Sequence, residues 1–307
     1  MSTRSSSVAL LGRRPGLTAA LGAGCIAFSA ILVRLSQVSP DTAAVFRCLY
    51  ALPALGLLAW RERRRYGPAG RRDRRVALAA GVFFALDLIA WHRSIEAVGA
   101  GLATVLGNLQ VVLVGLVAWR LLGERPSNRL LVAVPVVVAG IVLISGVLEE
   151  GAYGEDPVAG TVFGILTAVA YTGFVLLLRR ANADLRRPAG PLFDATLAAT
   201  VVTLAAGLAL GDLDLVPGLP AQGWLVLLAL TSQVAGWLLI SISLPRLPAA
   251  VTSVVITLQP VGSVFLAVLL LVEAPSAVQF AGVALVLAGV MTAARAQRRV
   301  PIPEPAG

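Results

Sequence analysis

The chain contains no lysine, a single histidine and only two cysteines among its 307 residues. These absences exclude several kinds of site, because one histidine and two cysteines are too few for a structural zinc site, an iron–sulfur cluster or a bis-histidine haem. Both cysteines, Cys25 and Cys48, lie inside apolar runs, so we expect buried, inert thiols rather than a disulfide. The sequence therefore predicts no metal, no cofactor and no catalytic residue.

Charged residues are also scarce, at 13% of the chain, whereas 58% of the residues are hydrophobic and the mean hydropathy is +0.86. A water-soluble domain needs more polar groups than this to cover its surface. The sequence therefore predicts a protein whose solvent is the lipid bilayer. The net charge of +9 does not indicate nucleic-acid binding, because the arginines lie in short segments between apolar runs rather than on one face.

Ten apolar runs are long enough to cross the membrane as helices, which takes roughly 20 residues each. We therefore predict an all-α polytopic membrane protein with ten transmembrane helices. The predicted spans are Gly16–Ser36, Thr42–Trp60, Val76–Trp91, Gly99–Trp119, Arg129–Val147, Val158–Leu178, Pro191–Leu210, Gln222–Leu244, Ala249–Val272 and Ala277–Ala296. Pro53, Pro135 and Pro260 are expected to bend their helices. The segment GTVFG, with Gly160 and Gly164, is a small-xxx-small pair suited to close helix packing.

The placement of arginine predicts the orientation in the membrane. With both termini in the cytoplasm, 22 of the 25 basic residues lie in cytoplasmic segments, eight of them in RERRRYGPAGRRDRR. This agrees with the positive-inside rule, and the opposite orientation contradicts it. The connections on the other side carry acids instead: Glu149, Glu150, Glu155, Asp156, Asp212 and Asp214.

The chain repeats itself when it is shifted by 149 residues. From Ala100 to Gly140 the two copies align without a gap and share 15 identities in 41 positions, with Gln110 on Gln259. Two units of five spans are therefore predicted. Because five is odd, the second unit enters the membrane upside down, and inverted repeats of this kind are typical of transporters with a central substrate site. The expected divisions are a cytoplasmic segment 1–15, a first repeat 16–147, a periplasmic linker 148–157, a second repeat 158–296 and a cytoplasmic tail 297–307.

Two matching corners, LLGERPS and LLVEAPS, mark the repeat and place Glu124 on Glu273. We expect each glutamate to lie at the membrane edge, near the positive N-terminal end of the helix that follows it. The proline suits the first turn of that helix and the serine suits its cap. This role is architectural, so neither glutamate is a candidate for the substrate site.

The ten-span, two-unit plan, the G-E-R-P and V-E-A-P corners and the run DLIAWHRSIEAVGAGLATVLGNLQVVLVGLVAWRLLGERP resemble the EamA family of the drug/metabolite transporter superfamily. The resemblance covers essentially Gly16 to Ala296. It implies a multi-pass protein of the bacterial inner membrane that exports amino acids, other metabolites or toxic compounds. Its expected partners are the lipid bilayer and a small-molecule substrate, with no nucleic acid.

Polar side chains inside the spans are costly and are therefore the candidates for a substrate pathway. In the fourth span Thr104 and Asn108 lie one turn apart, and their repeat mates Ser253 and Thr257 do so in the ninth span. Polarity on the same face of both units predicts a shared central cavity. Hydroxyl groups bonded to their own helix backbone are the alternative.

The eighth span carries Gln233, Trp237 and Ser241 at i, i+4 and i+8, on one helix face. The shift of 149 residues matches Ser241 with His92, so the single histidine is expected to face the same space, with Trp91 beside it. His92 is able to titrate near neutral pH. The alternative for both His92 and Trp91 is a place at the membrane–water interface. Trp237 lies deeper and is the better candidate for stacking against a substrate ring.

Two charged residues are predicted inside the membrane, Arg47 in the second span and Asp87 in the third. An unpaired charge there is costly, so we expect the two to pair. Asp87, His92 and Arg47 are the candidates for proton or charge coupling, although the resemblance favours a structural role for Arg47. Tyr171 of the sixth span corresponds to Phe28 of the first and is a further candidate for the pathway.

The leading functional prediction is a transporter that exports small metabolites, with amino acids as first candidates, by alternating access to a central cavity between the repeats. Efflux of drugs or toxic cations is the alternative. A membrane enzyme is disfavoured, because one histidine and few intramembrane acids do not provide a nucleophile with its base.

Overall fold

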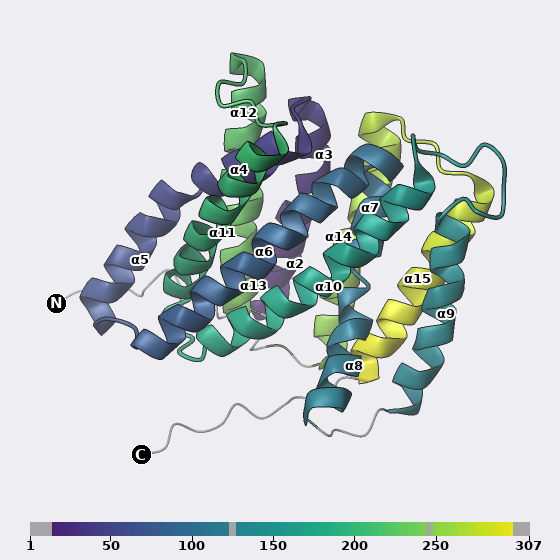
Figure 1. Ribbon diagram of the computed structural model, residues 1–307. Coiled ribbons are helices and arrows are strands. Elements are labelled where there is room, and N and C mark those ends of the chain that lie inside the picture. Colours follow the sequence, from purple (N-terminus) through teal and green to yellow (C-terminus); the bar gives the residue numbers. More distant parts are fainter. Residues whose placement is uncertain (1–13, 123–126, 244–246, 248, 297–307) are drawn as a thin grey trace.

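The computed structural model describes residues 14–122, 127–243, 247 and 249–296, without the side chains of 118–119, 121–122, 249–254, 256 and 296. Every regular element among these residues is a helix (Figure 1). The helices are α2 (Pro15–Ala27), α3 (Ser29–Ser36), α4 (Pro40–Leu49), α5 (Leu52–Tyr66), α6 (Arg71–Val98), α7 (Ala100–Gly107), α8 (Gln110–Leu122), α9 (Asn128–Ile144), α10 (Pro157–Ala181), α11 (Ala189–Leu210), α12 (Leu219–Leu228), the π-helix η1 (Ala229–Gly236), α13 (Trp237–Ser243), α14 (Ala249–Leu271) and α15 (Ala277–Ala296).

These helices form the ten predicted spans, several of which are interrupted. Eight continuous or nearly continuous helical stretches are long and apolar enough to cross a membrane, and the apolar helices Asn128–Ile144 and Thr257–Leu271 are shorter. Spans one, two and four each consist of two helices, α2–α3, α4–α5 and α7–α8, and span eight contains η1. The prediction of an all-α protein with ten membrane helices is thus confirmed.

The interruptions have local causes. The break between α4 and α5 precedes Pro53, which lies in the first turn of α5, where its missing N–H leaves no hydrogen bond unmade. The break between α7 and α8 lies at Asn108, whose side-chain amide donates to the carbonyl of Thr104 at 2.8 Å. This bond competes with the regular helical ladder. Pro135 and Pro260 lie within α9 and α14.

Two helices extend well beyond the predicted spans. Helix α6 begins at Arg71 rather than Val76 and continues past Trp91 to Val98. Helix α5 includes the basic run that ends at Tyr66, so the predicted connection between spans two and three shrinks to residues 67–70. Arginine is a good helix former, and its long side chain reaches out of the apolar layer. A hydropathy boundary therefore underestimates the length of these helices.

The connections gather at two ends of the molecule that differ in charge. The acidic end holds residues 37–39, 99, 145–156, 211–218 and 272–276, and it carries all six acids of the predicted outer connections. The basic end holds residues 67–70 and 182–188. There Arg187 donates to the carbonyls of Tyr66, Gly67 and Pro68. The hydrogen bond of Arg186 holds the pKa of Asp184 below its usual range, with burial acting against it.

The inverted repeat is visible in which helices pack together. Helix α10 of the second repeat runs along α6 of the first, and α2 of the first repeat packs in the equivalent way against η1 and α13 of the second. The pairs α9–α15, α4–α11 and α7–α14 each join equivalent spans of the two repeats. In Figure 1, α2 rises from the N-terminal end whereas its counterpart α10 descends from the opposite end.

Small residues let several of these pairs approach closely. A Cβ placed on Gly160 of α10 would lie 2.5 Å from Val98 Cβ, and one on Gly164 would lie 2.5 Å from Leu106 Cβ. Gly140 and Gly282 do the same between α9 and α15, each against the other's carbonyl oxygen. The expectation that GTVFG mediates close packing is therefore confirmed.

The corner at Glu273 differs from its prediction. The Ser276 hydroxyl caps α15 by accepting from Gln279 N at 3.0 Å, as expected. Glu273, however, accepts hydrogen bonds from the backbone of Ala100 and Gly101 at the start of α7, and not from α15. Val272 takes a left-handed conformation (φ 54°) that turns the carboxylate across to the other repeat. Residues 123–126, including Glu124, lie outside the described part of the chain.

Candidate functional site

A small cavity lies at the centre of the helix bundle, between the two repeats. Its volume is about 40 Å³, enough for only a few water molecules. Residues from both repeats line it: Ile26, Ser29, Arg47, Phe84, Asp87, Leu88, Trp91, Thr104, Gly107, Asn108, Thr167, Tyr171, Trp237 and Gln259. In this conformation the space is therefore too small to hold a metabolite.

Aromatic rings form one wall of this cavity. Trp237 of α13 meets Phe174, Tyr171 and Phe84 edge-on, with ring centroids 5.0, 5.9 and 6.2 Å away. Phe84 and Phe174 stack at 4.4 Å. Such rings offer apolar contact area, and their faces attract cations.

A buried arginine joins the second and eighth spans beside this wall. Arg47, only 3% exposed, donates through Nε to Gln233 Oε1 at 3.2 Å and through Nη2 to Ser232 Oγ at 3.3 Å. Gln233 in turn donates to Thr196 Oγ1 at 3.1 Å. Both acceptors of the guanidinium lie in the π-helix η1, a rare element that often occurs at functional sites.

The Arg47 guanidinium also lies near two rings of the cavity. Its Cζ atom is 5.5 Å from the centroid of the Trp91 ring and 5.9 Å from that of Phe84. The positive charge is thus held by neutral oxygens and aromatic faces, which offsets part of the cost of burying it.

Asp87 is placed differently from its prediction. Its carboxylate is 7% exposed and lines the cavity. Among the described residues it forms no ion pair and receives no hydrogen bond, so the expected direct pairing with Arg47 is wrong. The physical reason is that Gln233 and Ser232 accept from Nε and Nη2 of Arg47 and hold its guanidinium against η1, although the guanidinium has further N–H groups beyond these two. The two opposite charges act on each other only through space.

The wall formed by α7 carries the polar residues of the fourth span. Thr104 donates to the carbonyl of Ala100 at 2.8 Å and accepts from Ser263 of α14 at 3.0 Å. Asn108 lies one turn further on, at the helix break. The alternative expected for Thr104, a hydroxyl bonded to its own helix backbone, is therefore present. The same side chain also lines the cavity.

Two further polar atoms of the cavity residues lack partners. Trp237 Nε1 and Thr167 Oγ1 are buried and form no hydrogen bond with a described residue. Buried donors of this kind are normally paired. Together with the Asp87 carboxylate, they give the cavity both donors and an acceptor for a bound molecule.

Seven of the predicted site residues thus meet at one cavity: Arg47, Asp87, Trp91, Thr104, Asn108, Tyr171 and Trp237. Gln233, Ser241 and Thr257 do not line it, and the side chain of Ser253 lies outside the described part. His92 also lies apart, 1% exposed, and neither of its ring nitrogens forms a hydrogen bond with a described residue. Substrate binding by any of these residues stays a prediction.

Three polar cavity residues were not among the predicted site: Ser29, Thr167 and Gln259. Thr167 lies one turn before Tyr171 on α10, so the i, i+4 spacing that marked other pairs also marks this one. Gln259 is the repeat mate of Gln110, which made it a marker of the repeat rather than a candidate for the site. Both signals were therefore present in the sequence.

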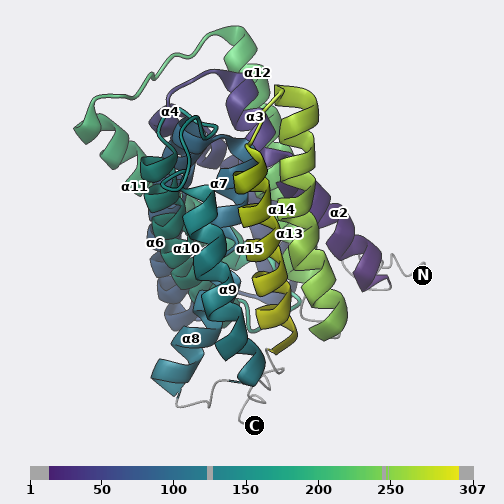
Figure 2. The ribbon, with the colours of Figure 1, turned by 90° about the vertical axis from the view of Figure 1, so that its right-hand side faces the viewer.

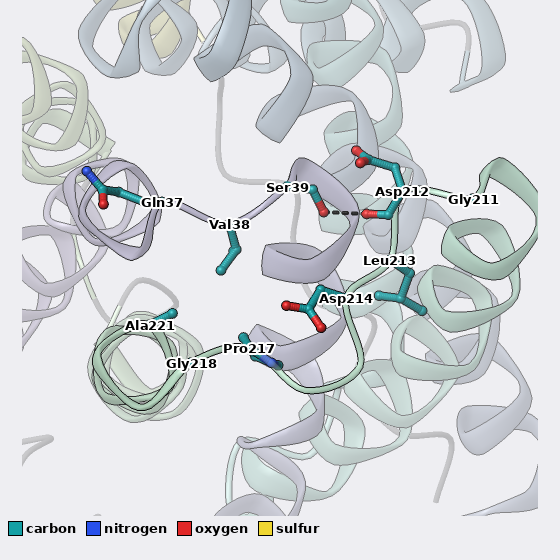
Figure 3. Close-up of a pocket in the computed structure, with 10 residues that line it drawn as sticks. All are labelled: Gln37, Val38, Ser39, Gly211, Asp212, Leu213, Asp214, Pro217, Gly218 and Ala221. Atoms are coloured by element: carbon teal, nitrogen blue, oxygen red, sulfur yellow. Dashed lines mark hydrogen bonds between the residues drawn. The ribbon is translucent and has the colours of Figure 1, made fainter.

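A second, larger cavity of about 470 Å³ opens at the acidic end, between residues 37–39 and 211–221. Figure 3 shows Asp212 and Asp214 at its rim, with Ser39 donating to the carbonyl of Asp212. It shares no lining residue with the central cavity. Within the described residues, no group of three or more histidines, cysteines or acids is placed to hold a metal ion.

The burial and charge of the central cavity suit the recognition of a small polar molecule. Among the described residues that line it, the charged ones are Arg47 and Asp87, which are opposite in sign. The arrangement offers an acceptor for a cationic group, donors for an anionic or carbonyl group, and rings for apolar parts.

Comparison with known proteins agrees with this fold. A solved crystal structure is similar over 91% of this chain and 97% of its own, with a TM-score of 0.63 and 18% sequence identity, a likeness that shows the fold alone. No curated protein matches the sequence. The model of the EamA-like transporter family matches twice, over residues 14–146 and 158–295, so that each match spans five of the ten helices. The chain therefore belongs to the EamA-like transporter family of membrane proteins.

Proposed function

We propose that this membrane transporter exports small metabolites from bacterial cells across the inner membrane, with amino acids as the first candidates. Access to the central cavity alternates between the two sides. The arginine-rich basic end faces the cytoplasm with both termini, and the acidic end faces outward, as the positive-inside rule favours.

The observation that carries this proposal is the unpaired carboxylate of Asp87 in a cavity that also contains Arg47 and aromatic rings. A buried carboxylate without a partner is costly. An ammonium group of the substrate is a suitable partner for it, while the Trp237 indole N–H and the positive charge of Arg47 favour a carboxylate group. A zwitterion with an apolar side chain provides an ammonium group for Asp87, a carboxylate for Trp237 and Arg47, and an apolar part for the aromatic rings.

Efflux of toxic organic cations is the second candidate, and the same carboxylate favours it. A cation lacking a carboxylate would use Asp87 and the ring faces of Trp91 and Tyr171. Arg47 distinguishes the two candidates, because its charge attracts a zwitterion's carboxylate but repels a simple cation. Either substrate needs a larger space than about 40 Å³, so transport requires a conformation in which the cavity is wider.

Transport by purified protein in proteoliposomes tests the proposal, with labelled amino acids and a fluorescent organic cation offered in parallel. We expect uptake of at least one amino acid, and a loss of ten-fold or more in Asp87→Asn, since a charge-assisted bond contributes about 1.5–3 kcal/mol. Glu96→Gln is the matched control, because Glu96 is exposed on the same helix, away from the cavity.

Each result has a distinct meaning. Movement of the cation alone replaces the amino-acid assignment by the second candidate, and movement of neither removes both. Wild-type rates in Asp87→Asn remove Asp87 from substrate binding. A pH gradient across the liposome membrane then separates proton exchange from facilitated diffusion, since only proton exchange lets the gradient drive the substrate uphill.

A further inference from the structure

A buried glutamate ties the two repeats together at the acidic end. Glu273, 3% exposed, lies between α14 and α15 of the second repeat. Its two carboxylate oxygens accept hydrogen bonds from Ala100 N at 2.6 Å and Gly101 N at 3.1 Å, the first residues of α7 in the first repeat. A carboxylate at this position satisfies backbone donors that a helix start leaves free and meets the positive end of the helix dipole.

This contact is not needed to build the corner in which Glu273 lies. Helix α15 is capped by its own residues, because Ser276 and Gln279 exchange hydrogen bonds at 3.0 Å. Gln279 also holds the linker between the repeats, through Tyr153 N at 2.9 Å and Tyr153 O at 3.0 Å. Glu273 is thus free to act between the repeats. Burial raises the pKa of its carboxyl, and the two backbone N–H groups act against that rise.

From Glu273 a continuous seam between α7 and α14 leads down to the central cavity. In the first turn, a Cβ on Gly101 would lie 3.2 Å from Val264 Cα and 3.3 Å from Ala267 Cβ, so the two backbones are almost in contact. In the next turn Ser263 donates to Thr104 at 3.0 Å. Thr104 itself lines the cavity. The seam therefore lies between the cavity and the acidic end.

At the basic end the described residues show no packing equivalent to this seam, and residues 123–126 there lie outside the described part of the chain. The repeat relates α7 to the first half of α14, and the second half of α14 to α8, so the symmetric contact would join α8 to the start of α14. Among the described residues α14 packs against α7 but shares no substantial packing with α8. Figure 2 shows the lower parts of α8 and α14 on opposite sides of α9 and α15.

We propose that Glu273 is the latch that closes the central cavity toward the acidic end, and that release of its two bonds to α7 lets α7 and α14 separate there. The proposal rests on the proposed alternating access, since a latch matters only if that end opens. It assigns a moving role to a residue whose motif looked purely architectural in the sequence. The small residues of the seam, Gly101 and Ala267, allow a close fit that is made and broken without interlocking side chains.

The first experiment measures access to the cavity and needs no known substrate. Cys25 and Cys48 are replaced by alanine, and Ser29→Cys, at the cavity, reports labelling by a membrane-impermeant thiol reagent added to the side that the acidic end faces. Val216→Cys in a separate variant identifies that side, because Val216 is 80% exposed at the acidic end. We expect Glu273→Gln to raise the labelling rate of the thiol introduced by Ser29→Cys about ten-fold or more. The glutamine carbonyl can accept from only one of the backbone N–H groups of Ala100 and Gly101, and its NH2 group, itself a donor, then faces the other.

Glu149→Gln is the matched control. Glu149 lies at the same end and accepts from Ser276, but it has no bond to α7. We expect the thiol introduced by Ser29→Cys to be labelled at the same rate with and without Glu149→Gln. Equal rates in Glu273→Gln and in the background overturn the latch, and so does an equal rise in both glutamine variants, because the effect then belongs to the whole loop.

A second variant keeps the proposal testable if Glu273→Gln does not fold. In the cysteine-free background with Ser29→Cys, Gly101→Cys with Ala267→Cys places two thiols across the seam at a Cβ–Cβ separation of 3.3 Å, close to that of a disulfide. Oxidation should reduce labelling from the acidic side ten-fold or more, and reduction should restore it, whereas each single cysteine variant should not respond. Unchanged labelling after complete cross-linking shows that the seam does not open. Because labelling needs no transport, this result is separate from a failure to find a substrate.

Discussion

The contact between α10 and the end of α6 gives the sharpest stability prediction. Gly160→Ala adds one methyl group at a point 2.5 Å from Val98 Cβ, 2.9 Å from Val98 Cγ1 and 3.1 Å from Val98 N. Val98 is fully buried and its Cβ is fixed to the backbone, so the helices must move apart. That movement also stretches the bond from Ser94 Oγ to the Gly160 carbonyl, now 2.8 Å.

The expected magnitude follows from three contributions. Overpacking by one methyl group costs about 1–3 kcal/mol, and weakening one neutral hydrogen bond costs about 1 kcal/mol. Alanine in place of glycine within a helix returns about 1 kcal/mol. We therefore expect a net loss of about 1–3 kcal/mol, seen as a melting temperature several degrees lower for the detergent-solubilised protein in heated size-exclusion profiles.

Gly223→Ala is the matched control for this substitution. Gly223 is also helical, but a Cβ there meets nothing within 4 Å, so the gain in helix propensity stands alone and the melting temperature should stay equal or rise. If Gly160→Ala melts at or above the wild-type temperature, close packing of α10 on α6 is not what stabilises this pair, and the reasoning from Cβ distances fails.

Two further predictions concern the cavity and the basic end. Trp237→Phe keeps a ring against Phe174 but removes the unpaired Nε1 donor. We therefore expect KM for an accepted substrate to rise about five-fold, as for one lost neutral hydrogen bond, and an unchanged KM means that this donor does not meet the substrate. Arg187→Lys replaces a guanidinium that binds three carbonyls of residues 66–68, and it should lower the melting temperature by a few degrees, whereas Arg186→Lys, at a more exposed position, should not.

The architecture was predictable because the bilayer imposes length and polarity directly on the sequence. Apolar runs located all ten spans, and the offset of 149 residues revealed the inverted repeat that the packing of α10 on α6 and of α2 on α13 displays. The helix limits were less accurate, since arginine-rich flanks continue the helices of spans two and three beyond the apolar layer. Breaks without proline, as at Asn108, depend on a side-chain bond that no hydropathy pattern records.

The residues that line the central cavity were predictable in part, but their contacts were not. Intramembrane polarity selected Arg47, Asp87 and Asn108, all of which lie at the cavity. The partner of Arg47 was not predictable, because opposite charge suggested Asp87 whereas the π-helix places two neutral oxygens closer. Glu273 shows the same limit, since its partners lie 172 and 173 residues away in the chain.

The Arg47 contacts also explain why the two repeats are not identical at their shared interface. If the offset of 149 residues found from Ala100 onward also holds in the second span, it matches Arg47 of α4 with Thr196 of α11, and these two helices pack against each other. Gln233 bonds to both, accepting from Arg47 and donating to Thr196. A strict repeat would put two buried guanidinium groups around one amide, and like charges this close in a dry interior repel strongly. One repeat therefore carries the charge and the other a hydroxyl, and the cavity keeps a single positive group for the unpaired Asp87 to act on.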